Sequence, residues 1–311
     1  MNRELEKQSG YNYGVRHLRS SERQTLINCL VNQTELRLED ILPLCELGAI
    51  YINELRYQGD GSVKVNASDV IRIHTTPRRF IVNLEEIKNR ILFNCADYVV
   101  VNKPAGLPVH AIVDNHEENL LAALREILNQ DVLITHRLDI PTSGVMVFAK
   151  NSDFQSHFNK LLQTGRIKKI YQAMVDISAL PSPFQLSKPY IHFMEKSPRA
   201  PKVLRTENTK DDLRCELSVL NVETLANKVQ LLDVHPLTGR THQIRAQLGA
   251  LGSPILGDIS YGSQFRSRDG SETIALQSSR IEFSDLNEKP VTFSLPNLNF
   301  AVQDFLNRAL A

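Results

Sequence analysis

The stretch HRLDIPTSG at residues 136–144 combines side-chain types that can do chemistry. Ile140 precedes Pro141, which restricts Ile140 to extended or turn geometry, and Gly144 allows unusual backbone angles before an apolar run. Asp139 is therefore expected on a rigid turn beside a buried strand. A carboxylate there can bond nearby amides in an Asx-type turn, hold a metal or act as a nucleophile. The residues alone leave all three open.

A second stretch, HPLTGRTHQIRAQL at residues 235–248, places basic side chains around a predicted helix start: His235, Arg240, His242 and Arg245. Arginines in a first turn oppose the helix dipole, which favours a carboxylate or phosphate partner. A solvated basic helix end is the alternative. Because His242 and Arg245 lie one turn apart, they can approach the same partner.

Two further stretches carry weaker signals. In RIKKIYQAMV, Tyr171 falls on the apolar face of a predicted strand and follows Lys168 and Lys169. A ring with neighbouring lysines suits stacking on a base near phosphates, although a core tyrosine with solvated lysines fits equally. In VNKPAGLPVH, a predicted strand leads into a turn at Lys103-Pro104, which alone indicates only a tight turn.

Taken together, these stretches resemble the RluA-type family of RNA pseudouridine synthases over about residues 90–310. The matching elements, of which the second and fourth are the most specific, are KPAG at 103–106, HRLDIPTSG at 136–144, KIY at 169–171, TGRTHQIR at 238–245 and GSPILGDISYG at 252–262. Gln247 and Ser253 stand where the family commonly has histidines.

The resemblance implies an isomerase that needs no cofactor and no metal. It assigns Asp139 to the ribose–base junction of a flipped-out uridine, Arg245 to an ion pair with Asp139, and Tyr171 to stacking on the uracil. Arg240 is the second candidate for the ion pair. Whether Asp139 forms a covalent adduct or removes a sugar proton stays open. Further RNA contacts are expected from Arg137, His136, Lys103, Thr142, Lys169, Arg240 and His242.

The length of 311 residues predicts two domains. The expected segments are a flexible stretch over 1–20, a small module over 21–76, a linker over 77–90 and a catalytic domain over 91–311. The module should contain a helix over 38–47 and strands at 49–53 and near Val70–Ile73. Its Gly48–Asn53 and Ser68–Ile71 segments resemble the S-four-type RNA-binding module.

The predicted fold class is α+β: a bent mixed sheet with flanking helices, preceded by the small α/β module. Apolar periodicity predicts strands over 98–101, 145–149, 168–175 and 229–234. The predicted helices cover 117–129, a segment from an N-cap at Ser152 to Gly165, and a segment from about Thr241 to Gly252.

Composition narrows the class of protein. A hydrophobic content of 42% with 23% charged residues is ordinary for a globular chain, and no apolar run approaches the roughly 20 residues of a membrane span. The N-terminus lacks a secretory pattern, and four scattered cysteines without a CxxC pair fit reduced thiols in the cytoplasm. The net charge of +1 means that RNA needs a local basic surface, for which the candidates are Lys168, Lys169, Arg199 and Lys202. A monomer is expected.

Rival functions remain. An RNA-binding assembly factor on the same fold would keep the motifs without catalysis. A metal-dependent hydrolase is disfavoured because the nine histidines show no HxxxH or HxH spacing. A serine hydrolase is disfavoured because Ser143 lies in TSG and not in a G-x-S-x-G elbow.

Overall fold

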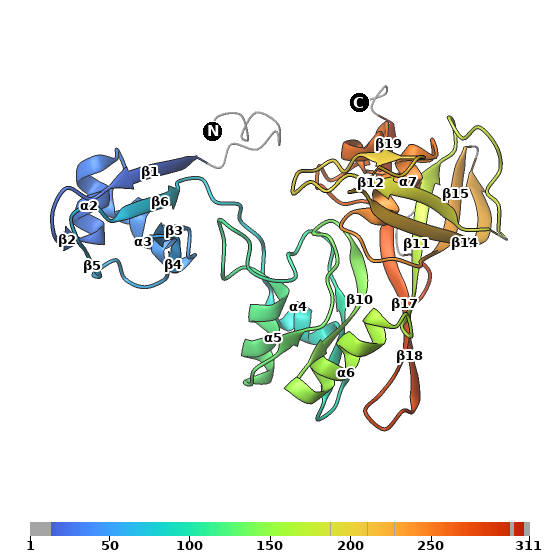
Figure 1. The fold of residues 1–311 in the computed structure, drawn as a ribbon, viewed down its shortest axis with the longest axis horizontal. Helices are drawn as coiled ribbons and strands as arrows, with labels where there is room; N and C mark the ends of the chain where they lie inside the picture. Colours follow the sequence, from blue (N-terminus) through green and yellow to red (C-terminus); the bar gives the residue numbers. More distant parts are fainter. Residues whose placement is uncertain (1–13, 187, 210, 227, 299–301, 308–311) are drawn as a thin grey trace. The chain divides into compact units, whose positions relative to one another are not determined.

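The computed structural model describes residues 14–186, 188–209, 211–226, 228–298 and 302–307. Contacts within the chain define two units (Figure 1). The N-terminal unit comprises the residues up to Val82 together with His110–Ala123, and the large unit comprises Asn83–Val109 and the residues from Leu124 onward. Residues 110–123 thus belong to the N-terminal unit, although they lie inside the range 91–311 that was predicted as the catalytic domain.

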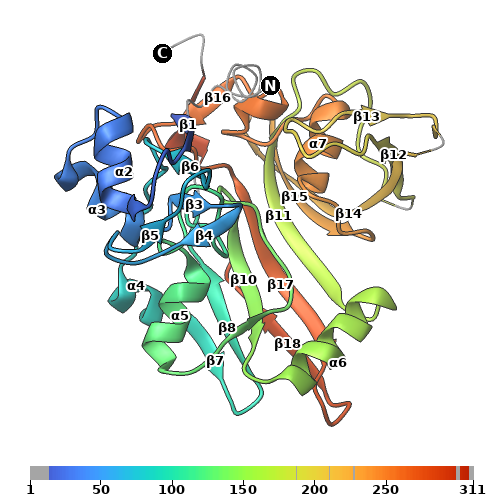
Figure 2. The ribbon, with the colours of Figure 1, turned by 60° about the vertical axis from the view of Figure 1, so that its left-hand side comes forward.

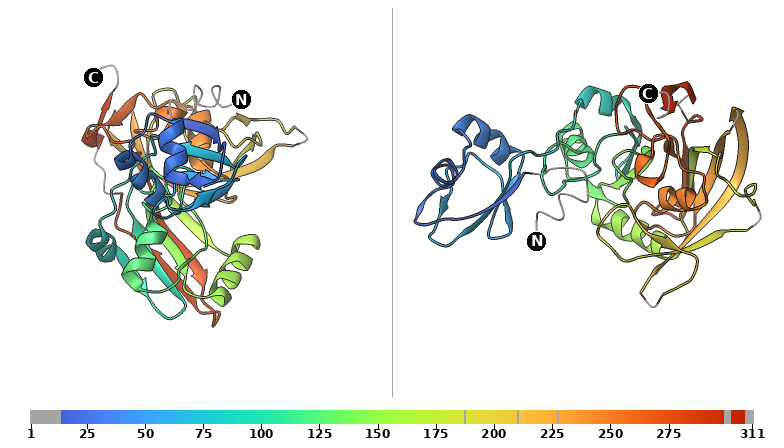
Figure 3. Two further views of the ribbon diagram at one scale, coloured as in Figure 1. Left: turned by 90° about the vertical axis from the view of Figure 1, so that its left-hand side faces the viewer. Right: turned by 90° about the horizontal axis from the view of Figure 1, so that it is seen from above.

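The N-terminal unit is a small sheet with two helices, seen in blue from further directions in Figure 3. Its four-stranded sheet has the order β1 (Val15–Arg19), β6 (Val70–His74), β3 (Ile50–Ile52) and β4 (Leu55–Tyr57). The helices are α2 (Leu26–Gln33) and α3 (Leu38–Glu46), and β2 (Gln24–Thr25) pairs with β5 (Lys64–Val65). Leu26, Leu30, Ile41, Ile50 and Ile71 are fully buried between helices and sheet.

The predicted helix over 38–47 and both predicted strands of this unit are confirmed. Within the stretch 1–20 that was predicted to be flexible, Val15–Arg19 form β1 and pair antiparallel with β6. Residues 1–13 lie outside the described residues. Part of the predicted linker is also regular structure, because Asn83 caps the helix α4 (Leu84–Asn89).

The large unit contains a mixed sheet, with eleven strands in the described residues. Its main path runs β13 (Leu204–Arg205), β12 (Tyr190–Met194), β14 (Leu213–Ala226), β15 (Val229–Pro236), β11 (Lys168–Asp176), β17 (Leu276–Ser284), β10 (Ser143–Ala149), β8 (Tyr98–Lys103) and β7 (Ile91–Asn94). β18 (Pro290–Ser294) pairs with β17, and β9 (Leu133–Ile134) pairs with β10. The α+β class with a mixed sheet is confirmed.

The remaining elements are helices and short pieces. The helices are α5 (Leu120–Leu128), α6 (Ser152–Gln163) and α7 (Gln243–Ala250), with short 3₁₀ turns η1 (Ile259–Tyr261) and η2 (Val302–Asp304). The short strands β16 (Phe265–Ser267) and β19 (Phe305–Asn307) pair with each other. In Figure 2, α6 lies across the face of the sheet, where Phe154 and Phe158 are fully buried with residues of β8, β10 and β17.

Two predicted helix starts need correction. The N-cap of α6 is Asn151 and not Ser152, because the Asn151 side chain accepts a hydrogen bond from the Phe154 N–H at 2.9 Å. The last helix begins at Gln243, and His242 before it has left-handed backbone geometry with φ 58°. The predicted strands of the large unit are confirmed.

The β10–β17 contact is the parallel pairing of this sheet, and it aligns two of the chemical motifs. Gly144 lies opposite Ser278 in that pair, and Tyr171 lies opposite Ser278 in the antiparallel β11–β17 pair. Gly144 has φ +118°, and a Cβ there would sit 2.3 Å from the Ser278 carbonyl oxygen. Glycine is therefore required at the end of HRLDIPTSG, because only it lets the turn approach β17 this closely.

A Gly144→Ala variant is expected to lose about 3 kcal/mol of unfolding free energy, since the added methyl group meets backbone atoms that cannot move aside. Chemical denaturation measures this loss. Gly165→Ala is the matched control: Gly165 also has positive φ (+67°), but a Cβ there meets no atom within 4 Å, so only about 1 kcal/mol should be lost. Equal losses in the two variants would contradict the close-approach argument.

Candidate active site

Asp139 sits on a turn that several backbone contacts fix. The Thr142 N–H donates to the Asp139 carbonyl oxygen at 3.1 Å, which closes the turn. The Ile140 carbonyl oxygen accepts two hydrogen bonds, from the Gly106 N–H at 2.8 Å and from Lys103 Nζ at 3.1 Å. The KPAG and HRLD motifs therefore meet, and the first holds the second.

Lys103 is fully buried. Besides Ile140, its Nζ donates to the carbonyl oxygens of Pro104 at 2.8 Å and Leu107 at 2.7 Å. An ammonium has three protons, so these three acceptors leave none for a phosphate. Burial lowers the pKa of Lys103 to about 7, although the charge of Asp139 opposes that shift. The expectation that Lys103 contacts RNA is therefore corrected: Lys103 positions the turn that carries Asp139.

The lowered pKa of Lys103 predicts a pH dependence of stability. Between about pH 7 and pH 10 the unfolded chain keeps a proton that the folded chain releases, so the unfolding free energy rises with pH across that window. A Lys103→Met variant lacks this contribution. The difference in unfolding free energy, wild type minus variant, is expected to grow by about 2 kcal/mol from pH 7 to pH 9. Parallel stability curves would contradict the assignment.

Arg245 links two carboxylates. Its Nε and Nη2 bind Asp258 Oδ2 at 2.7 Å and Oδ1 at 3.0 Å, and its Nη1 donates to Asp139 Oδ2 at 3.3 Å. The side chains of Arg245 and Asp258 are 8% and 1% exposed, whereas that of Asp139 is 22% exposed. The bidentate pair fixes the guanidinium plane, and the remaining nitrogen orients a carboxylate that keeps access to solvent.

This cluster holds two carboxylates, Asp139 and Asp258, for one guanidinium. Burial disfavours the cation of Arg245, but its hydrogen bonds to Asp258 and the charges of both carboxylates raise its pKa above the usual value. Because Asp258 already balances the guanidinium charge, Arg245 orients the Asp139 carboxylate more than it neutralises it. Such a carboxylate stays available as a nucleophile or a base.

His242 approaches the same carboxylate oxygen. Its Nε2 lies 3.9 Å from Asp139 Oδ2, and its Nδ1 is 2.9 Å from the Tyr261 hydroxyl oxygen, which also accepts from the Lys202 N–H. Burial lowers the pKa of His242, although the Asp139 charge opposes this. His242 is therefore a neutral imidazole at pH 7, and it flanks Asp139 without forming a full ion pair.

Tyr171 lies on β11 with only 7% of its surface exposed. Burial, followed by the negative charge of Asp139, raises the pKa of the Tyr171 phenol, so the hydroxyl stays protonated at neutral pH. The charge of Asp139 is thus one of the causes that keep the Tyr171 phenol neutral.

The other residues predicted to contact RNA fall into two groups. His136 and Thr142 pack against other parts of the large unit: His136 Nε2 accepts from the Val147 N–H at 3.2 Å, and its ring stacks on Phe158. His136 is half-buried and Thr142 is 2% exposed. Contact of either side chain with RNA stays a prediction.

Arg137, Arg240 and Lys169 differ in their surroundings. Arg137 is exposed on the turn beside Asp139. Arg240 is also exposed, and its Nε donates to the Arg214 carbonyl oxygen at 3.4 Å. The structure thus brings Arg245, and not Arg240, to Asp139. Lys169 is half-buried on β11, and burial lowers its pKa.

Two residues of this cluster were not predicted from the sequence, Asp258 and Tyr261. Both lie in GSPILGDISYG, a motif whose side chains had no predicted role. The sequence could have indicated Asp258, because an aspartate inside an apolar motif needs a cationic partner when it is buried.

Among the described residues, no three His, Cys, Asp or Glu side chains gather closely enough to hold a metal ion. No helix in the described part of the chain is long and apolar enough to span a membrane.

The chain is similar in sequence to known proteins. The family model described as "RNA pseudouridylate synthase" matches residues 97–250, which include the Asp139 turn, β11 and α7. An uncharacterized RNA pseudouridine synthase of Mycoplasma genitalium is 30% identical over 280 residues, covering 88% of this chain and 87% of the relative. The chain therefore belongs to the RNA pseudouridine synthase family. The tRNA pseudouridine synthase C of Vibrio cholerae is 31% identical, covering 60% of this chain and 81% of the relative.

Coverage differs among the relatives. The chain spans less than half of two plant relatives, the chloroplastic RNA pseudouridine synthases 6 of Oryza sativa and Arabidopsis thaliana, at 46% and 45% of their lengths. Among solved structures, "Human RNA Pseudouridylate Synthase Domain Containing 1" superposes with a TM-score of 0.53 at 21% identity, covering 70% of this chain and 86% of that one. This likeness supports the fold.

Proposed function

We propose that the chain isomerises specific uridines in RNA to pseudouridine, with Asp139 acting at a nucleotide swung out of its helix. One observation carries the proposal: a partly exposed carboxylate, Asp139, lies 3.3 Å from the buried guanidinium of Arg245. A protein that only binds RNA has no need of an oriented carboxylate in this position. Family membership supplies the reaction class.

The reaction breaks the bond between uracil N1 and ribose C1′ and forms a bond between C5 and C1′. The proton leaves C5, N1 gains a proton, and no electrons or groups are exchanged with another molecule. The Asp139 carboxylate serves this reaction either by attacking the nucleotide or by removing a sugar proton. Both routes need a carboxylate that is fixed in direction, and the hydrogen bonds from Arg245 to Asp258 and to Asp139 support this.

The remaining predicted residues bind the substrate. A paired uridine must be extruded before it reaches Asp139, at a cost of about a few kcal/mol. Arg137, exposed beside the turn, is suited to fill the vacated position, and Tyr171 to stack on the uracil. Arg240, His242 and Lys169 are proposed to supply the local positive charge or hydrogen bonds to RNA that the net charge of +1 does not.

The substrate class proposed is structured RNA in the cytoplasm, either tRNA or ribosomal RNA, modified by a monomer. A relative named as a tRNA pseudouridine synthase supports tRNA. The N-terminal unit, whose sequence resembles an S-four-type module, is proposed to assist RNA binding.

Mapping pseudouridines in total RNA from cells with and without the gene tests this function. We expect one or a few positions to be modified only when the gene is present, and their location identifies the RNA. Identical maps in the two strains, with the protein expressed in the first, would contradict the proposal.

A further inference from the structure

Residues 110–119 form a segment of the N-terminal unit that we call the strap. The chain passes from the large unit into the strap directly after Val109. It passes back into the large unit within α5, where Ala123 belongs to the N-terminal unit and Leu124 to the large unit. Just before it, Leu107 accepts the hydrogen bond from Lys103 Nζ, and Gly106 donates to Ile140. The strap is thus continuous with the turn that holds the Asp139 loop.

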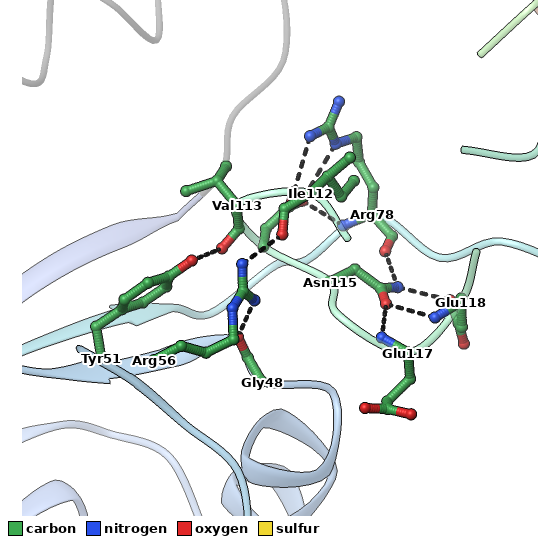
Figure 4. A network of polar contacts seen from close by, with 10 residues as sticks. Gly48, Tyr51, Arg56, Arg78, Ile112, Val113, Asn115, Glu117 and Glu118 are labelled. Atoms are coloured by element: carbon green, nitrogen blue, oxygen red, sulfur yellow. Dashed lines mark hydrogen bonds and ion pairs between the residues drawn. The ribbon is translucent and has the colours of Figure 1, made fainter. Parts of the chain in front are cut away.

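One end of the strap is bound by a basic aromatic cluster of the N-terminal unit (Figure 4). Arg56 donates to the carbonyl oxygens of Gly48 at 2.5 Å and Ile112 at 2.7 Å, and the Tyr51 hydroxyl donates to the Val113 carbonyl oxygen at 2.9 Å. The guanidinium carbons of Arg72 and Arg56 lie 3.9 Å and 4.9 Å from the centre of the Tyr51 ring. This cluster resembles a nucleic-acid contact in composition, but strap carbonyl oxygens accept the bonds from Arg56 Nη2 and from the Tyr51 hydroxyl.

The middle of the strap is fixed by a buried ion pair. Asp114 is fully buried and accepts three bonds from Arg78: from Nη2 at 2.8 Å, from Nε at 3.2 Å and from the backbone N–H at 2.8 Å. Burial opposes the charge of Asp114, but the bonds from Arg78 dominate and lower its pKa. Losing one partner of such a pair is strongly unfavourable, because the other charge stays buried.

The C-terminal end of the strap is also held by an ion pair and by hydrogen bonds to backbone groups. Glu118 accepts from Arg79 Nη2 at 2.6 Å and from the Phe80 N–H at 2.7 Å, while Asn115 Nδ2 donates to the Arg78 carbonyl oxygen at 2.8 Å. The His116 N–H donates to the Leu47 carbonyl oxygen at 2.7 Å. Side chains and backbone of the N-terminal unit thus hold the strap from Ile112 to Glu118.

We propose that the N-terminal unit holds the strap in order to keep the Lys103–Leu107 turn, and through it the Asp139 loop, in its working geometry. Tyr51, Arg56, Arg78 and Asp114 are then positioning residues for catalysis, although none lies at the reacting atoms. The inference rests on the proposed function for its kinetic test, but the coupling itself has a structural readout.

The test compares full-length wild type with Arg78→Met, Tyr51→Phe and the control Arg37→Met. Tyr51→Phe keeps the ring and removes only the bond to Val113, so it leaves the unit folded. Arg37 is an exposed arginine of the same unit that pairs with Glu39 and Asp40. Its variant loses the same charge without releasing the strap.

In turnover assays on RNA, we expect kcat to fall about tenfold or more in Arg78→Met and by a smaller factor in Tyr51→Phe, with KM within about twofold. In hydrogen exchange, the Gly106 and Thr142 amides, which bond Ile140 and Asp139, should exchange faster in the same two variants. Arg37→Met should match wild type in both measurements.

Two outcomes would overturn the proposal. The first is a rise in KM alone, which would make the cluster an RNA-binding surface. The second is release of the strap, seen as fast exchange at the His116 amide, while kcat and the Gly106 and Thr142 amides stay unchanged. If the wild-type protein showed no turnover on any RNA, the proposed function would be refuted instead. Hydrogen exchange at the Gly106 and Thr142 amides of the variants would then still test whether the strap holds the Asp139 loop.

Discussion

An Asp139→Asn variant is expected to form essentially no pseudouridine, with kcat lower by at least about 10⁴-fold. The asparagine amide has the same shape and accepts a hydrogen bond from Arg245, but it carries no charge with which to attack the nucleotide or remove a proton. RNA affinity should stay within about threefold, because the phosphate contacts are untouched. Nucleoside analysis of digested RNA measures turnover, and filter binding measures affinity.

The matched control is Asp131→Asn, an exposed aspartate eight residues earlier in the chain. It should keep wild-type turnover. Wild-type rates in Asp139→Asn would remove this carboxylate from the mechanism, and a loss of RNA binding in step with activity would point to a substrate-binding role instead.

The second large effect is expected for Arg245→Lys, with kcat lower by about 10²-fold to 10³-fold. A lysine keeps the charge but cannot bind Asp258 through two nitrogens while a third reaches Asp139. The Asp139 carboxylate would lose its fixed direction, and errors of about 1 Å at a reacting group cost about that much. Single-turnover kinetics with saturating protein isolates this step from RNA binding.

Arg240→Lys serves as the control for Arg245→Lys. Arg240 is exposed and bonds the Arg214 carbonyl oxygen, so its variant should keep kcat within about threefold. The opposite ranking, in which Arg240→Lys is inactive and Arg245→Lys is active, would assign the ion pair to the other arginine and contradict the observed contact.

Much of the site was predictable because its motifs are local in sequence. The turn geometry of HRLDIPTSG follows from Ile140-Pro141 and Gly144, and the one-turn spacing of His242 and Arg245 lets both reach one oxygen of Asp139. Alternation in 168–175 likewise predicted the strand that carries Tyr171. These features depend on neighbours within a few residues.

The rest depends on partners far along the chain. Two of the carbonyl oxygens around the Lys103 ammonium, those of Pro104 and Leu107, are local, but the third belongs to Ile140, 37 residues away, and the burial of Lys103 was not predicted. The role of Asp258 follows from an arginine thirteen residues earlier, on another element. The attachment of residues 110–119 to the N-terminal unit depends on charge pairs such as Arg78–Asp114, separated by 36 residues.

The most direct measurement uses RNA with tritium at uracil C5, incubated with the wild-type protein. If Asp139 isomerises uridine, each pseudouridine formed releases one tritium to water, with the RNA strand intact. No tritium release, or strand cleavage in its place, from RNA that the protein demonstrably binds would contradict the account.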